Sequence, residues 1–284
     1  MGEVVTRFAP SPTGRLHLGH AYAAKVAHDA AREAGGRFLL RIEDLDQGRS
    51  RPAFEAGILE DLEWLGLRWD GEIVRQSERA DAHRAAIARL QAMGLVYPCF
   101  CTRREITEEI AASGAAPHGP EGPVYPGTCR VLSSDEAASR TASGASHALR
   151  LNVAEAAKTV GPLSWRDRRR GEVAARPERF GDVVLARKDA PAAYHLAVVV
   201  DDAAAGVTLV TRGEDLFEAT DVQVLLQRLL DLETPQYLHH RLVCGEDGKR
   251  LAKRDRSRTI AAMRESGRKA ETVRELIAAE ANDD

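Results

Sequence analysis

The sequence predicts an α/β protein built around a parallel sheet. Strand-like and helical segments alternate before residue 98 and again after residue 180, which favours parallel strands joined by crossover helices. With 284 residues, of which 44% are hydrophobic, the chain is long enough for a buried core in roughly one to three domains. Aromatic residues make up only 5% and alanine is abundant, which favours helices packed through small side chains.

The N-terminal elements follow from local breaks in the pattern. Residues 4–8 are predicted to form a strand, which a Pro-Ser-Pro-Thr-Gly sequence ends, and a helix is predicted over 17–34 before two glycines stop it. Ser50 and Pro52 are typical of a helix start. The further predicted elements here are a strand at 37–42 and helices at about 52–66 and 78–93.

The second half begins with an interruption of this pattern. Residues 99–179 are rich in Gly, Pro and Ser and contain only short strand patterns, so we expect an inserted subdomain there. After it, the continuous apolar, β-branched run at 194–200 predicts a central buried strand. The remaining expected elements are a strand at 207–211, an amphipathic helix at 216–232 and a basic helical segment after residue 245.

Composition excludes several classes of protein. Four cysteines, three of them around one Gly/Pro-rich loop, are not the pattern of a secreted disulfide framework. The N-terminus lacks the features of a signal peptide, and the longest apolar run, at about 196–200, is too short to span a bilayer. A soluble, cytoplasmic protein without a membrane partner is therefore expected. The net charge is −3, but basic residues concentrate at 166–179 and 246–270, where each segment can meet phosphate.

The strongest local signal is the sequence Pro-Ser-Pro-Thr-Gly-Arg-Leu-His-Leu-Gly-His at residues 10–20. It stands between the first predicted strand and a helix, a position at which α/β proteins bind ligands. There His17 and His20 can donate hydrogen bonds to triphosphate oxygens, the helix N-terminus favours an anion, and Gly19 leaves room for a base against the backbone. A Pro/Gly turn followed by two surface histidines is the alternative.

A second motif is the basic sequence Gly-Lys-Arg-Leu-Ala-Lys-Arg at residues 248–254. Its Lys253 can neutralise the charge that builds on a departing pyrophosphate during adenylyl transfer. Taken alone, such a loop is usually a solvated basic turn. Taken together, the two motifs resemble the two signatures of the class I aminoacyl-tRNA synthetases, the second in a degenerate form.

Longer matches narrow the resemblance to the glutamyl-tRNA synthetases. The matching stretches are residues 7–14, 40–46, 199–202 and 211–216. Because few residues follow the second signature, we expect no large helical anticodon-binding region. In this it is similar to truncated relatives of those enzymes, which attach glutamate to the queuosine base in the anticodon of tRNA(Asp).

The resemblance implies how the chain is divided and what it does. It implies a Rossmann-like class I catalytic domain at 1–98 and 181–245, an inserted zinc-bearing subdomain at 99–180 and a short helical C-terminal extension at 246–284. It also implies an enzyme, expected to be a monomer, that activates L-glutamate with ATP and Mg²⁺ and transfers it to queuosine-containing tRNA(Asp). The alternatives are a compact enzyme that charges the 3′ end of tRNA(Glu) and a catalytically retired paralogue that binds nucleotide or RNA.

The resemblance assigns five residues to a glutamate pocket: Arg7, Ser11, Glu43, Tyr194 and Arg212. Their chemistry agrees, because each arginine can offer a planar fork to a carboxylate and Glu43 can bind an ammonium group. Tyr194 can add a hydroxyl donor. For each arginine taken singly, the alternative is an ordinary ion pair.

The resemblance assigns four residues to ATP: His17, Gly19, His20 and Lys253. Of these, His17, His20 and Lys253 are expected to be catalytic. Further acids, among them Asp201 and Asp202, are expected to cap or solvate loops and are given no catalytic role.

Three cysteines near one Gly/Pro-rich loop can hold a structural Zn²⁺: Cys99, Cys101 and Cys129. For the fourth ligand, chemistry alone favours His118, because a neutral imidazole binds zinc near pH 7 while a tyrosine hydroxyl must first lose its proton. The resemblance selects Tyr125 instead, and a metal does lower the pKa of an oxygen bound to it. Unliganded buried thiols are the alternative. Cys244 lacks partners in the sequence and is expected in the core.

Overall fold

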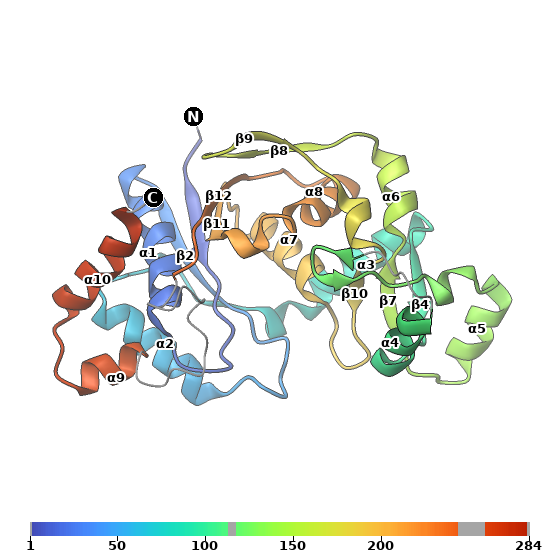
Figure 1. Cartoon of the computed structure of the whole chain (residues 1–284), viewed down its shortest axis with the longest axis horizontal. Helices are drawn as coiled ribbons and strands as arrows, with labels where there is room; N and C mark the ends of the chain where they lie inside the picture. The colour runs from blue at the N-terminus through green and yellow to red at the C-terminus, as the bar shows by residue number, and fades with distance from the viewer. Residues whose placement is uncertain (1, 113–117, 244–258, 283–284) are drawn as a thin grey trace.

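The computed structural model describes residues 2–112, 118–243 and 259–282. In Figure 1 the first strands and the C-terminal helices lie at one end of the molecule, and a second, smaller sheet lies at the other end. Lys253 and Cys244, singled out from the sequence, lie outside the described residues. Among the described residues, no helix combines the length and the apolar character needed to cross a bilayer.

A parallel sheet forms the centre of the fold, as predicted. β1 (Val5–Phe8) pairs in parallel with β2 (Arg37–Ile42), which pairs in parallel with β3 (Val74–Arg75). On the other side of β1 lies β11 (Leu209–Gly213), where Thr208 N donates to Val5 O at 3.0 Å. β11 begins a four-stranded ladder that continues this layer, with β12 (Gln236–His240) and β8 (Ser164–Asp167), both parallel, and the antiparallel edge strand β9 (Gly171–Ala174).

Helices cover the sheet where the helical pattern predicts them. They are α1 (Leu18–Glu33), α2 (Pro52–Trp64), α3 (Ala80–Ala92) and α8 (Thr220–Leu229), with short 3-10 turns η1 (Gln76–Arg79) and η4 (Glu214–Leu216). The buried face of α1 is mostly alanine, which lets the helix lie close enough for Thr6 Oγ1 to donate to the carbonyl of Ala27 at 2.7 Å. Glycine is required at Gly36, because a Cβ there would stand 1.9 Å from the carbonyl oxygen of Val4.

The strand predicted at 194–200 is wrong: these residues begin helix α7 (Tyr194–Ala204). The helix packs against α3, α8 and β10 (Val184–Ala186), so that most of its surface is buried. A helix buried on every side shows no 3.6-residue periodicity, and its apolar run then looks like a central strand. Burial by tertiary packing outweighs the strand preference of the three consecutive valines.

The inserted region holds its own antiparallel sheet, in the order β10, β7 (Ala148–Leu151), β4 (Val96–Cys99). It is more helical than its composition suggests. Its other elements are α4 (Arg103–Ala112), β5 (His118–Gly119), β6 (Gly122–Pro123), η2 (Thr128–Val131), α5 (Ser134–Ala142), α6 (Val153–Val160) and η3 (Pro177–Phe180). The two outer strands of this sheet do not keep to the expected limits, because β4 begins before residue 99 and β10 lies after residue 180. By contrast, β8 and β9 lie within those limits but join the central sheet. The expected division at those limits remains a proposal.

Two C-terminal helices, α9 (Ile260–Glu265) and α10 (Ala270–Asn282), pack on the first half of the chain. Ile260 N donates to Leu16 O at 2.9 Å, immediately before the histidine motif. Arg264 pairs with the buried Asp61 of α2, with 3.0 Å between Nη1 and Oδ1. The C-terminal end of the described chain is therefore tied to the start of α1 and to α2.

The Asp61–Arg264 pair should make stability depend on pH. Burial raises the pKa of Asp61 to about 6, although Arg264 beside it acts in the opposite direction. The folded state thus binds this proton more tightly than the unfolded state, and the carboxyl's contribution to stability falls as pH rises from about 4 to 6. Because Arg264→Met removes the buried partner, we expect it to cost about 3 kcal/mol of unfolding free energy at pH 8 and much less at pH 5.

Urea denaturation at the two pH values measures this difference. Arg274→Met is the control, because Arg274 contacts the exposed Glu271 and the carbonyl of Leu65 and should show no such pH dependence. An equal loss for Arg264→Met at both pH values would contradict the prediction.

Candidate active site

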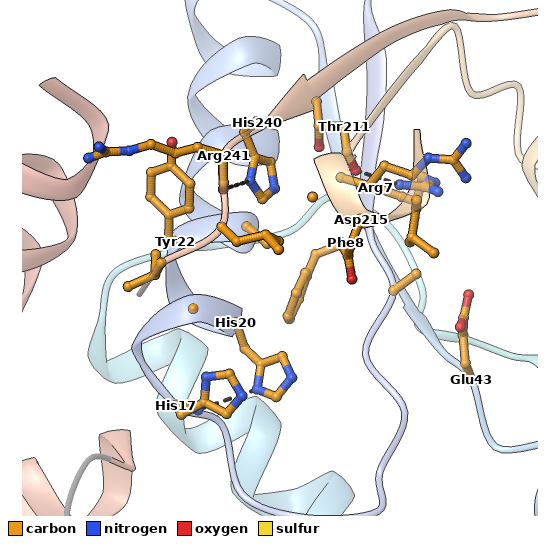
Figure 2. A pocket seen from close by; sticks show the side chains of 18 of the residues that line it. Arg7, Phe8, His17, His20, Tyr22, Glu43, Thr211, Asp215, His240 and Arg241 are labelled. Atoms are coloured by element: carbon orange, nitrogen blue, oxygen red, sulfur yellow. Dashed lines mark hydrogen bonds between the residues drawn. The ribbon is translucent and has the colours of Figure 1, made fainter. Parts of the chain in front are cut away.

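One cavity, of about 450 Å³, opens where the carboxyl ends of β1, β11 and β12 meet the start of α1 (Figure 2). Side chains from both halves of the chain line it. The lining includes Arg7, His17, Gly19, His20, Glu43, Tyr194, Thr211, Arg212, Asp215, His240 and Arg241. Described members of both predicted groups, those for the nucleotide and those for the amino acid, thus meet at one cavity.

The histidine motif forms the N-terminal end of α1. The rings of His17 and His20 stack with 3.7 Å between their centroids, and the backbone N–H of His17 donates to His20 Nδ1 at 3.4 Å (Figure 2). A Cβ at Gly19 would stand 3.3 Å from the ring of His17, so glycine keeps this ring in place. Two residues that flank positions 244–258 in the sequence also lie here, since Val243 approaches Gly19 and Thr259 forms a β-bridge with His17.

A buried ion-pair network lies on the other side of the cavity. Arg7 Nε donates to Asp202 Oδ1 at 2.9 Å, and Arg41 binds the same carboxylate as well as Glu43 Oε1, the latter at 3.1 Å. Burial alone would raise the pKa of Asp202, but Arg41 and Arg7 outweigh it and lower that pKa. The pKa of Glu43 is raised by burial despite the neighbouring Arg41.

This network corrects the expected role of two acids. Asp201 and Asp202 are buried rather than solvated in loops, because they belong to α7 and not to the end of a strand. Asp201 accepts hydrogen bonds from Gln76, Arg79 and His83, which join α7 to η1 and α3. Sequence reasoning also missed Arg41, although it lies within the matched stretch 40–46.

Arg212 is held in a different way from Arg7. Its guanidinium donates to His239 Nε2 at 3.0 Å, to Gln223 Oε1 at 2.7 Å and to Thr220 Oγ1 at 2.5 Å. Within the part of the chain that the structure describes, no carboxylate pairs with it. Arg212 therefore brings a buried positive charge to the cavity.

The last two predicted glutamate residues lie at the edge of this cavity. Tyr194, the first residue of α7, lines it, and burial raises the pKa of the tyrosine hydroxyl. Ser11 lines a neighbouring cavity of about 340 Å³, which shares Glu43 and Tyr194 with the first. Four of the five predicted residues thus meet in one cavity, and Ser11 lies next to it.

The three predicted cysteines form a cluster beside β4. The Sγ atoms of Cys99, Cys101 and Cys129 all lie within 4.8 Å of one another. Tyr125 points its hydroxyl at this cluster, 3.4 Å from Cys99 Sγ and 3.6 Å from Cys101 Sγ. The side chain of His118, the other predicted ligand, lies outside what the structure describes.

This cluster fits a tetrahedral zinc ion. Zn–S bonds of about 2.3 Å place sulfur ligands about 3.8 Å apart, and the Sγ atoms of Cys101 and Cys129 are 3.4 Å apart. Burial raises the pKa of Cys101 to about 11, so a cation is needed to keep this thiol ionised near neutral pH. The residues present can therefore hold a metal ion.

Comparison with known proteins places the chain among tRNA synthetases. Residues 3–279 match the family model described as tRNA synthetases class I (E and Q), catalytic domain. A glutamyl-Q tRNA(Asp) synthetase of Rhodobacter capsulatus is 52% identical, covering 96% of this chain and 99% of that protein. One from Symbiobacterium thermophilum is 46% identical, covering 94% of this chain and 83% of that protein.

Longer synthetases are also similar. A glutamate–tRNA ligase of Aquifex aeolicus is 40% identical, covering 94% of this chain but 55% of that protein. The crystal structure of a glutamate tRNA ligase from Elizabethkingia meningosepticum in complex with its amino acid matches with a TM-score of 0.76 and 30% identity, over 89% of this chain and 52% of that one.

The Asp202 network should contribute strongly to stability. Asp202→Asn leaves two buried guanidinium groups with less than their full counter-charge, and we expect it to lower the unfolding free energy by about 3–5 kcal/mol. Urea denaturation measures this loss. The matched control is Glu136→Gln, which removes an exposed ion pair with Arg140 and should cost less than about 1 kcal/mol. Similar losses for the two variants would show that Asp202 is not the stabilising centre.

Proposed function

The chain belongs to the class I tRNA synthetases of the glutamate and glutamine type, and we propose that it activates L-glutamate with ATP and transfers it to the queuosine base in the anticodon of tRNA(Asp). The observation that carries the first half is the single cavity that joins the stacked His17–His20 pair to the buried cation Arg212. The second half is supported by the printed names of relatives that match over nearly their whole length.

Activation forms a mixed anhydride between glutamate and AMP. An oxygen of the glutamate α-carboxylate attacks the α-phosphorus of ATP, the bond to the β-phosphate oxygen breaks, and pyrophosphate leaves with the displaced charge. His17 and His20, at the N-terminal end of α1, are placed to donate hydrogen bonds to phosphate oxygens. We assign Lys253 to the departing pyrophosphate, and Mg²⁺ bound with ATP supplies further charge neutralisation.

Recognition of glutamate follows from the charges around the cavity. Arg212 is the partner we assign to the side-chain carboxylate, because its own protein partners are neutral. Glu43 is assigned to the ammonium group, and the hydroxyl of Tyr194 adds a donor, with Ser11 beside them in the neighbouring cavity. Arg7 also lines this pocket, and it remains paired with Asp202.

Transfer requires no protein nucleophile. A hydroxyl of the queuosine cyclopentenediol attacks the activated carbonyl carbon, the bond to the phosphate oxygen breaks, and AMP leaves. Positioning supplies most of the rate in such a step. Exposed arginines at the tip of the β8–β9 hairpin, Arg168 to Arg170, are the phosphate contacts we propose for the anticodon arm.

The alternative with specific support is a compact enzyme that charges the 3′ end of tRNA(Glu). Glutamate–tRNA ligases match this chain at about 40% identity, although the chain spans little more than half of their length. The two functions share the activation step and differ only in the acceptor.

Two assays test this proposal: exchange with labelled pyrophosphate follows activation, and transfer of labelled glutamate to tRNA separates the two functions. We expect exchange of label between ATP and pyrophosphate with glutamate alone, and stable label only on queuosine-containing tRNA(Asp), in the anticodon. Arg168→Gln combined with Arg169→Gln should lower the transfer rate about tenfold or more and leave exchange unchanged. Label on the terminal ribose of tRNA(Glu), or equal label on tRNA(Asp) without queuosine, would favour the alternative.

We also propose that Cys99, Cys101, Cys129 and Tyr125 bind one structural zinc ion. Elemental analysis of protein purified without chelator should find about one zinc per chain, lost in Cys101→Ser. We expect that variant to lose order in the inserted region while the central sheet stays folded, because each has its own buried cluster. Zinc lost in His118→Ala and retained in Tyr125→Phe would identify His118 as the fourth ligand.

A further inference from the structure

Arg212 is surrounded by neutral hydrogen-bond acceptors. The imidazole of His239, the amide of Gln223 and the hydroxyl of Thr220 each accept one hydrogen bond from it. A guanidinium has five N–H groups, so two remain for a ligand. Only 6% of the Arg212 residue is exposed, and the exposed part faces the cavity.

Two other arginines, Arg7 and Arg41, are compensated. Arg7 and Arg41 share the carboxylate of Asp202, and Arg41 also binds Glu43, so these two cations are matched by two anions. A buried cation without a counter-charge is costly to fold and binds an incoming anion strongly. The absence of a counter-charge at Arg212 among the described residues therefore cannot be explained by stability, and it favours the binding of an anionic ligand.

His239 can accept from Arg212 only in one neutral tautomer. Burial and the adjacent Arg212 lower the pKa of His239 to about 4, so the ring is neutral near pH 7. Its Nδ1 lies 2.7 Å from Asp167 Oδ2, and because a carboxylate only accepts, Nδ1 must carry the proton and donate, which leaves Nε2 free to accept. Asp167 is held in turn by the backbone N–H groups of Arg169 and Arg170, at 2.9 and 3.0 Å.

Gln223 gives a second, independent indication that Arg212 is kept without a counter-charge from the described residues. Because Arg212 only donates, the amide must turn its oxygen toward it, which leaves Gln223 Nε2 buried without a hydrogen-bond partner among the described residues. A glutamate at this position would remove the unsatisfied amide and form an ion pair with Arg212. Stability alone would therefore favour glutamate, and the amide needs another explanation.

We propose that Asp167, His239 and Gln223 are positioning residues that hold Arg212 without neutralising it, and that they set the preference for a side-chain carboxylate over an amide in the activated amino acid. A counter-ion inside the protein would compete with the substrate carboxylate for the same cation. The imidazole of His239 lies between the Asp167 carboxylate and Arg212, so Asp167 fixes the tautomer of the ring without contacting Arg212. This inference rests on the proposed function, because it assumes that the amino acid binds at Arg212.

The test is Gln223→Glu, which changes the charge next to Arg212 and preserves the shape of the side chain. We expect the KM for glutamate in ATP–pyrophosphate exchange to rise at least about tenfold, the preference for glutamate over glutamine to fall by a similar factor, and the KM for ATP to stay within about twofold. The melting temperature should be equal or higher. A merely structural role predicts unchanged amino-acid kinetics, and that result would overturn the inference.

Gln227→Glu is the matched control. It makes the same change one turn further along α8, where Gln227 donates to the hydroxyl of Tyr237 and does not contact Arg212. Its KM for glutamate should stay within about threefold of wild type. An equal rise in both variants would assign the effect to added negative charge in general and overturn the inference.

A second pair of variants decides the matter if Gln223→Glu does not fold. Asp167→Asn offers an N–H to the ring, reverses the tautomer and should raise the KM for glutamate at least about tenfold. His239→Gln keeps a neutral acceptor for Arg212 and should stay within about fivefold. The opposite order would overturn the inference.

Failure of the proposed function has a different signature. In that case wild type shows exchange with an amino acid other than glutamate. The KM of Gln223→Glu for that amino acid then decides. If the side chain of the amino acid is anionic and the KM rises, the inference is supported; if the KM does not change, the result counts against the inference.

Discussion

The structure depends on a buried carboxylate shared by two arginines. Asp202 of α7 binds Arg7 of β1 and Arg41 of β2, so one helix from the second half of the chain is fastened to two adjacent strands from the first half. Isolated charges at this depth would be expensive, and together they satisfy one another. Because Arg7 and Glu43, two members of this network, line the cavity, the network also builds part of its wall.

Arg212, which also lines the cavity, is held in the reverse way, by groups that carry no charge. β12 and α8 supply the neutral acceptors of Arg212, and the carboxylate of Asp167 is separated from it by the ring of His239. The hairpin that supplies Asp167 lies in the region read as an insertion but extends the central sheet through β12. Its backbone turn, held by Asp167, carries the exposed arginines that we propose for the anticodon arm.

The cysteine cluster is organised separately from this cavity. Cys99, Cys129 and Tyr125 form a small buried group of their own, and the guanidinium of Arg150 lies 3.9 Å above the ring of Tyr125. The region has few large apolar residues and short strands, so a metal ion would supply cross-links that its core cannot. Tyr97 and Arg130, which flank the cluster, both donate hydrogen bonds to the buried Asp182. These bonds connect the cluster to the segment that leads into β10.

The sequence by itself determined the parallel sheet, the positions of β1, α1 and β2 and the histidine motif, because each depends on a local pattern. It also indicated the cysteine cluster, because thiols are few in this chain and are the preferred ligands of a structural zinc ion. Local pattern could not distinguish α7 from a strand, since a fully buried helix loses its periodicity. Only the tertiary structure decided the roles of Arg41, Asp202 and His239. Each has its role from a partner more than 25 residues away in the chain, and whether an arginine is compensated depends on which charges folding brings beside it.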